Sequence, residues 1–189
     1  MTDREAMEAL QGGDASGMDA LVAGHQRRAL QVAYQITRDR LAAEDIVADA
    51  FLTVYERVQH QDPARPFEPW LLRIVINRAI SVTRRAERFR RFAHLLRPRE
   101  RSEGPEETAE RREEQREVMR ALAALPANER AALSLRYLLD LDERAIANLL
   151  DWPLGTVKTR LRRGRDRLRQ QLVAAESDAG PACAIGAEL

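Results

Sequence analysis

The segment from Leu141 to Leu172, LDERAIANLLDWPLGTVKTRLRRGRDRLRQQL, predicts a short helix, a turn that contains Pro153 and a longer, arginine-rich helix. Asp142 is of a residue type that caps helix N-termini, and residues 151–154 have the length of the turn in a helix-turn-helix motif. Helical spacing predicts that the second helix buries Val157, Leu161, Leu168 and Leu172. A motif of this kind places its second helix in the major groove of DNA, so the segment predicts a DNA-binding unit.

The face opposite these apolar residues is the predicted DNA contact. Together with the basic residues that flank this face, the predicted contact residues are Thr156, Lys158, Thr159, Arg160, Arg162, Arg163 and Arg167. Hydroxyls and arginines can reach base edges, so Thr156, Thr159, Arg162 and Arg163 form the expected base-reading strip. Lys158, Arg160, Arg165, Arg167 and Arg169 are expected to contact phosphates. A solvated basic helix is the simpler alternative, but the turn, the apolar spacing and the basic face together favour DNA.

Composition indicates an all-α protein. The 189 residues are 44% hydrophobic, 32% charged and only 5% aromatic, which favours helices over a sandwich or barrel. The net charge of +1 is a sum of opposed patches, since seven of the twelve residues 158–169 are basic and residues 103–117 hold seven glutamates. A single cysteine, Cys183, excludes an internal disulfide.

Helical periodicity continues through the first half of the chain. Apolar residues recur at steps of three and four over residues 18–36 and again over residues 46–58. Three prolines between residues 61 and 69 predict a break, and Trp70 begins a further helix that runs to about Arg85. We therefore expect two small helical domains joined by a flexible linker, the second ending in the helix-turn-helix. The expected bounds are 1–92 for the first domain, 93–112 for the linker, 113–174 for the second domain and 175–189 for a disordered tail.

A second basic face is predicted in the first domain. Arg73, Asn77, Ser81, Arg84 and Arg88 follow one another at helical spacing. An asparagine amide both donates and accepts hydrogen bonds, which complements arginines that only donate. A solvated face is equally consistent with this pattern alone. Two basic faces on two linked domains favour a chain that holds two separated DNA segments.

Three segments resemble the sigma-70 family of RNA polymerase sigma factors, in its small extracytoplasmic-function (ECF) group. AEDIVADAFLTVYERV (residues 43–58) and FEPWLLRIVINRAISVTRR (67–85) resemble its core-binding and −10-recognition helices. The stretch from Leu122 to Leu172 resembles its −35-recognition domain, and GTVKTRLRRGRDRL is its most specific part.

The resemblance implies a promoter-specificity subunit that binds core RNA polymerase, recognises −10 and −35 elements and helps to open the duplex. It implies that Asp45, Asp49 and Glu56 dock on the clamp coiled coil of the largest polymerase subunit. The −10 contacts it implies, taken with the second basic face, are Arg73, Asn77, Arg78, Ser81, Arg84, Arg85 and Arg88. The proline-rich loop 62–68 would accept an unstacked base. An anti-sigma factor is a possible further partner.

Four residues depart from the usual family pattern. Ser81 stands where an aspartate is common and Ala48 where glutamine is frequent. Asp151 replaces a glycine in the turn, and Gly164 replaces an alanine, which lowers helix stability by about 1 kcal/mol. Aspartate tolerates the left-handed conformation, so we expect the turn to persist.

No enzymatic or metal chemistry is predicted. The three histidines, His25, His60 and His94, are scattered, and no phosphate loop, metal-ligand spacing or nucleophile motif is present. We expect no cofactor, no membrane insertion and a cytoplasmic location. Two other classes stay open: a stand-alone helix-turn-helix regulator that binds duplex DNA by itself, and an interaction protein that sequesters a partner through the acidic helix and linker.

Overall fold

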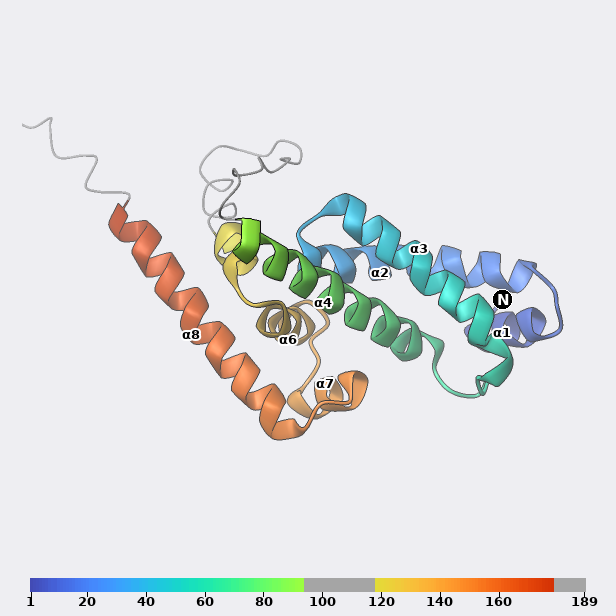
Figure 1. Cartoon of the computed structure of the whole chain (residues 1–189). Helices are drawn as coiled ribbons and strands as arrows, with labels where there is room; N and C mark the ends of the chain where they lie inside the picture. Colours follow the sequence, from blue (N-terminus) through green and yellow to red (C-terminus); the bar gives the residue numbers. More distant parts are fainter. Residues whose placement is uncertain (94–117, 179–189) are drawn as a thin grey trace, which may run out of the picture.

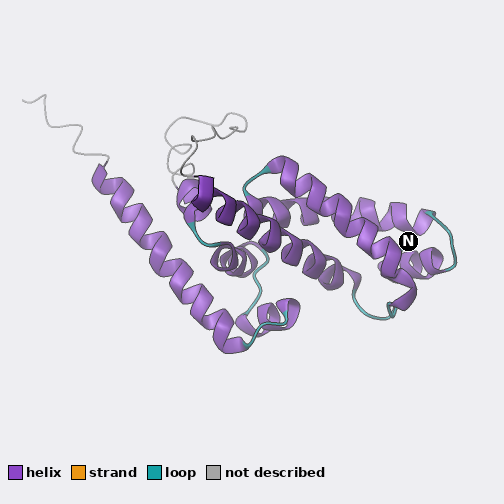
Figure 2. Ribbon diagram, viewed as in Figure 1, coloured by secondary structure: helices purple, strands orange, loops and turns teal. Residues whose placement is uncertain are grey.

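The computed structural model describes residues 1–93 and 118–178, and every regular element among them is a helix. Figure 1 shows them in chain order and Figure 2 shows the short loops between them. The elements are α1 (Asp3–Gln11), α2 (Ser16–Thr37), α3 (Arg40–Arg57), the short 3-10 helix η1 (Val58–His60), α4 (Phe67–Ala93), a helical stretch over 118–124, α6 (Ala127–Leu138), α7 (Glu143–Leu150) and α8 (Leu154–Asp178). This confirms the all-α prediction. The expected helix start near Glu113 and nearly all of the expected linker lie outside the described residues.

Helix α1 was not expected from the sequence. It begins with a capping box in which the Thr2 side chain accepts from the Glu5 backbone and the Glu5 side chain accepts from the Thr2 backbone. It buries Ala6, Met7 and Leu10 against α2. The two helices cross at Gly17, where an added Cβ would lie 2.8 Å from the Leu10 backbone nitrogen, so only glycine permits this approach.

Helices α2, α3 and α4 form the rest of the first domain. Their inward faces carry most apolar residues of the two periodic stretches, whereas Tyr34, Leu52 and Tyr55 within those stretches are exposed. Helix α4 is longer than expected, because it begins at Phe67 and reaches Ala93. Pro69 therefore lies in the first helical turn, where its missing N–H removes no helical hydrogen bond. The predicted break is confined to residues 61–66.

The second domain consists of the 118–124 stretch, α6, α7 and α8. Its buried residues include Leu133, Leu135, Ile146 and Leu150, and α8 contributes Val157 and Leu161. Leu168 and Leu172, predicted as buried, are only half-buried. Figure 1 shows why: the C-terminal half of α8 extends beyond α6, and the helix continues past the expected domain end to Asp178.

The two domains pack directly against each other. Helix α6 contacts α2 and α4, and α7 contacts α4. Buried residues of both domains belong to one continuous apolar cluster. The predicted −10 helix and the predicted −35 motif are therefore neighbours in this structure.

Candidate nucleic-acid interface

The helix-turn-helix has the geometry that its sequence predicted. The Asp142 side chain accepts a hydrogen bond of 2.7 Å from the Ala145 backbone, which caps α7. Asp151 ends α7 in the left-handed conformation (φ 57°, ψ 41°), and the Trp152 backbone donates to the Ala147 carbonyl at 3.0 Å. These contacts fix the turn, and buried Val157 fixes the start of α8 against α7.

The outward strip of α8 is accessible. Lys158, Arg162 and Arg163 are exposed, and Thr156 and Thr159 are half-exposed beside them. The Thr159 hydroxyl donates to the Gly155 carbonyl at 2.8 Å, so its oxygen remains able to accept from a base. Arg162 lies 4.0 Å from Asp166, an exposed pair that costs little to open. The four predicted base-reading residues are thus brought together on one surface.

Arg160 points inward instead. Its guanidinium lies 3.7 Å from the centre of the Trp152 ring, a cation–π contact that ties α8 to the turn. Burial lowers the pKa of Arg160, and the nearby positive charge of Arg84 lowers it further. The stack occupies the face of the guanidinium and leaves its in-plane N–H groups as the donors for any phosphate contact.

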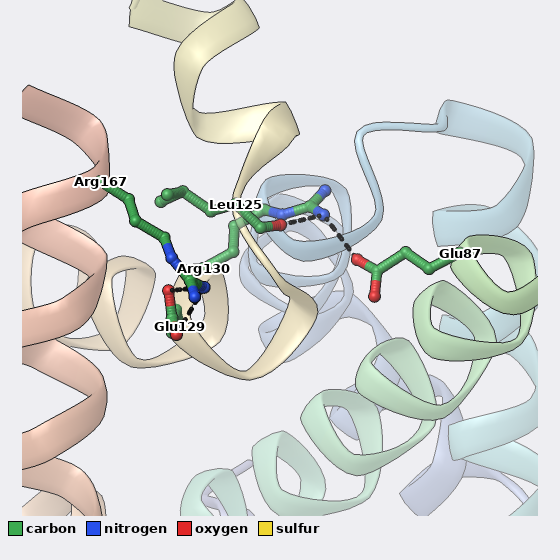
Figure 3. A network of polar contacts seen from close by, with 5 residues as sticks. All are labelled: Glu87, Leu125, Glu129, Arg130 and Arg167. Atoms are coloured by element: carbon green, nitrogen blue, oxygen red, sulfur yellow. Dashed lines mark hydrogen bonds and ion pairs between the residues drawn. The ribbon is translucent and has the colours of Figure 1, made fainter. Parts of the chain in front are cut away.

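Arg167 is also engaged within the protein. One of its guanidinium nitrogens donates to both carboxylate oxygens of Glu129 at 2.8 Å, as Figure 3 shows. The Glu129 side chain is only 9% exposed, so this pair is largely shielded from water on the α6 side. In this arrangement Arg167 secures α8 to α6, and the phosphate contact expected from the sequence requires the pair to open.

Helix α4 carries the second basic face. The predicted −10 residues Arg73, Asn77, Arg78, Ser81, Arg84, Arg85 and Arg88 are all exposed. Two of them have carboxylate partners: Arg73 lies 3.1 Å from Asp151 of the second domain, and Arg78 donates to Asp49 of α3 at 2.8 Å. Helical periodicity predicted that these residues share one exposed face of α4. It could not predict their carboxylate partners, which lie on other elements.

The proline-rich loop before α4 is held by α1. The Gln11 side-chain amide donates to the Val58 and Gln61 carbonyls, each at 2.7 Å. The Gln59 side chain donates back to the Gln11 carbonyl at 3.0 Å. At the far end of the loop, the Phe67 ring lies edge-on to Trp70 and contacts His25, whose ring pairs with Asp3. His25 is therefore a packing residue whose ring has a polar partner.

Helix α3 presents the predicted docking face. Asp45 and Glu56 are exposed, and Asp49 is half-exposed beside them. Sequence reasoning missed two apolar members of this face, Leu52 and Tyr55, each 61% exposed. The available signal was Leu52, an apolar residue on the otherwise polar side of the helix. Acidic and exposed apolar side chains together indicate a protein-binding surface.

No group of metal-ligating side chains occurs among residues 1–93 and 118–178. Within the same ranges, no helix is both long and apolar enough to cross a membrane.

Two family models match the chain, in the order of its two domains. Sigma-70 region 2 matches residues 21–89, and Sigma-70 region 4 matches residues 115–168. The first covers α3 and the predicted −10 residues of α4, and the second covers the helix-turn-helix.

Two similar proteins are named as ECF RNA polymerase sigma factors. The chain is 33% identical over 172 residues to "ECF RNA polymerase sigma factor SigE" of Mycolicibacterium smegmatis, covering 88% of this chain and 66% of that relative. It is 28% identical to the corresponding factor SigW of Bacillus subtilis, covering 91% and 97%. Among solved structures, CnrH in complex with the cytosolic domain of CnrY superimposes with a TM-score of 0.65 at 24% identity, covering 91% of this chain and 97% of that one. RpoE of Bartonella quintana in complex with the anti-sigma factor NepR gives 0.63 at 20% identity, covering 82% and 95%.

Proposed function

The chain belongs to the sigma-70 family, in its extracytoplasmic-function group, and we propose that its exposed surfaces divide the contacts of a sigma factor among three helices. The outward strip of α8 reads the −35 element, the basic face of α4 engages the −10 element, and the acidic face of α3 binds core RNA polymerase. The chain thereby directs the polymerase to promoters and promotes DNA opening. The chemistry of transcription belongs to the polymerase, and the chain itself is not an enzyme.

The observation that carries this proposal is the combination of three surfaces on one chain. A DNA-binding helix-turn-helix alone fits many regulators. This chain also has the basic face of α4 and, adjacent to it, the acidic and apolar face of α3. The combination fits a protein that contacts DNA at two places while bound to a large partner. We place this activity in the cytoplasm, where polymerase and promoters meet.

Transcription with purified components tests the proposal. The full chain is added to core polymerase and a promoter library, and run-off transcripts are sequenced. We expect transcripts from a defined promoter class that share −10 and −35 elements. Specific duplex binding by the chain alone, without transcripts, would instead identify a stand-alone regulator.

Docking is tested separately by charge reversal on α3. Asp45→Lys with Glu56→Lys should weaken binding to core polymerase at least tenfold, because like charges then face the basic partner that an acidic surface requires. Glu8→Lys with Asp19→Lys, at exposed positions on α1 and α2, is the control with the same change in net charge. Equal loss in both variants would show that net charge, rather than the α3 face, governs assembly.

A further inference from the structure

The loop between α3 and α4 is held at both of its ends. At its start, the Gln11 side-chain amide of α1 donates to the Val58 and Gln61 carbonyls, each at 2.7 Å. At its end, Phe67 is only 2% exposed and fixes the first turn of α4 in the core. The residues between these anchors, 62–66, are mostly exposed. The loop therefore presents its tip to solvent from two fixed points.

The tip itself is ordered by local contacts. Pro63 and Pro66 restrict two of its backbone φ angles. The Asp62 carboxylate accepts from the Ala64 backbone at 2.9 Å, and the Arg65 backbone donates to the Asp62 carbonyl at 3.0 Å. These are the contacts of a tight turn that an aspartate initiates. Because the tip is already ordered, a ligand that binds it loses little free energy to ordering the loop.

The exposed side chains of the tip can hydrogen-bond a nucleobase. Asp62 offers carboxylate acceptors and Arg65 offers guanidinium donors, and these side chains are 57% and 82% exposed. They lie 3.9 Å apart, a loose surface pair that opens at little cost. A base turned out of its stack presents donors and acceptors that such groups can bind. The tip also leads directly into α4, whose basic face begins at Arg73, within about two helical turns of Phe67.

Helix α1 supplies the anchor at the start of the loop. Figure 1 shows α1 beside the end of α3, where the loop begins, and α1 packs against η1. The contact is reciprocal, because the Gln59 side chain donates to the Gln11 carbonyl at 3.0 Å. Three other residues, Ala6, Met7 and Leu10, hold α1 in the core independently of the Gln11 amide. Loss of that amide should therefore release the loop without releasing the helix.

The anchoring helix lies outside the region that the family model describes. The match to Sigma-70 region 2 begins at residue 21, whereas α1 ends at Gln11. The loop and the basic residues of α4 lie within the match. A contact between the two parts thus connects a segment without an assigned role to the predicted −10 surface.

We infer that Gln11 is a positioning residue for the loop, so that α1 determines how firmly residues 61–66 hold an unstacked base of the −10 element. Gln11 acts through the loop and does not itself contact the base. The inference rests on the proposed function, because it concerns the −10 contact of a sigma factor.

Removal of single bases from the −10 element tests the inference. Holoenzyme assembled from the full chain and core polymerase binds promoter fragments with a pre-opened −10 bubble, in which each non-template base is replaced in turn by an abasic site. We expect one position at which base removal weakens binding by the parent holoenzyme most. Gln11→Met keeps an unbranched side chain but removes the amide. It should reduce that penalty by about fivefold, because two hydrogen bonds that order the loop are lost.

Two further substitutions separate positioning from charge. Gln11→Glu presents a carboxylate to the two carbonyls and should reduce the penalty at least as much as Gln11→Met does. Gln26→Glu, at an exposed position of α2, adds the same charge and should leave every penalty unchanged. If Gln11→Met instead weakens binding equally whichever base is absent, its role is merely structural and the inference is overturned.

Hydrogen exchange in the free, full chain tests the positioning without DNA or polymerase. Gln11→Met should speed exchange of the Gln61 and Arg65 amides, which donate to backbone carbonyls of the loop, by about fivefold relative to amides in the middle of α4. Unchanged exchange at both amides overturns the inference. Faster exchange combined with a parent holoenzyme that makes no promoter-specific transcripts would support the positioning by Gln11 and refute the proposed function.

Discussion

Helices α4 and α8 are both rich in arginine, but they use it differently. On α4 the predicted DNA residues are all exposed, and carboxylates of neighbouring elements pair with Arg73 and Arg78 at the surface. On α8, Arg162 and Arg163 lie on the outward strip, whereas Arg160 stacks on Trp152 and the half-exposed Arg167 pairs with Glu129. Arginine-rich sequence therefore predicts a basic helix, whereas contacts with other elements of the fold determine which of its arginines are available to DNA.

The largest expected effect on stability concerns the ion pair between Arg167 and Glu129. Arg167→Ala leaves the nearly buried Glu129 without its cation, which should lower the free energy of unfolding by about 3 kcal/mol. Urea denaturation measures this, and Arg163→Ala, at an exposed position, should change stability by less than about 0.5 kcal/mol. Unchanged stability with a uniform loss of DNA affinity would instead favour the phosphate contact expected from the sequence.

The outward strip should affect selectivity rather than stability. Arg162→Ala or Arg163→Ala should each reduce discrimination between −35 sequences by about 1–3 kcal/mol per bidentate base contact. Competition between promoter variants for the polymerase complex provides the measurement. Equal losses on every promoter would place the base-reading residues elsewhere on α8.

The Arg160–Trp152 stack should have an intermediate effect. Arg160→Met keeps an unbranched apolar stem but removes the charge, and should lower stability by about 1 kcal/mol through loss of the cation–π contact. Tryptophan fluorescence during unfolding, in chains with Trp70→Phe, follows this change at Trp152. Arg165→Met is the exposed control on the same helix. A stronger effect on DNA affinity than on stability would identify Arg160 as a phosphate contact.

The smallest stability effect is expected between α3 and α4. Asp49→Asn breaks an exposed pair with Arg78, whose side chains are 47% and 44% exposed, so unfolding should change by less than about 1 kcal/mol. Binding to core polymerase should still weaken if Asp49 belongs to the docking face. A large stability loss without any change in polymerase binding would show that Asp49 serves the fold alone.

Much of the fold was predictable because local rules specify it. The spacing of Val157 and Leu161, the cap at Asp142 and the left-handed residue at Asp151 are short-range features, and all three predictions hold. Helix α1 escaped prediction because its apolar face is short and acquires a core only by packing on Gly17 of α2. The extent of α4 was misjudged because Pro69 was taken as a stop although it lies in the first turn, where proline is tolerated.

The sequence predicted which faces of the helices form the site, but not the individual contacts that their side chains make. Glu129 and Arg130 gave no sequence signal, since each pairs with a residue dozens of positions away on another helix. Gly164, a departure from the family pattern, has a tertiary reason as well. An added Cβ there would lie 3.0 Å from Leu133, so the glycine allows α8 to approach α6 closely.

Site-directed cleavage of promoter DNA tests whether α4 and α8 contact different promoter elements. In chains with Cys183→Ser, an iron chelate is tethered to Val82→Cys beside the α4 face or to Asp166→Cys beside the α8 strip, and each is assembled with core polymerase and promoter. We predict cuts at the −10 element from the first position and at the −35 element from the second. Cuts at one common element, or the same pattern without polymerase, would contradict the assignment of the two helices to two promoter contacts.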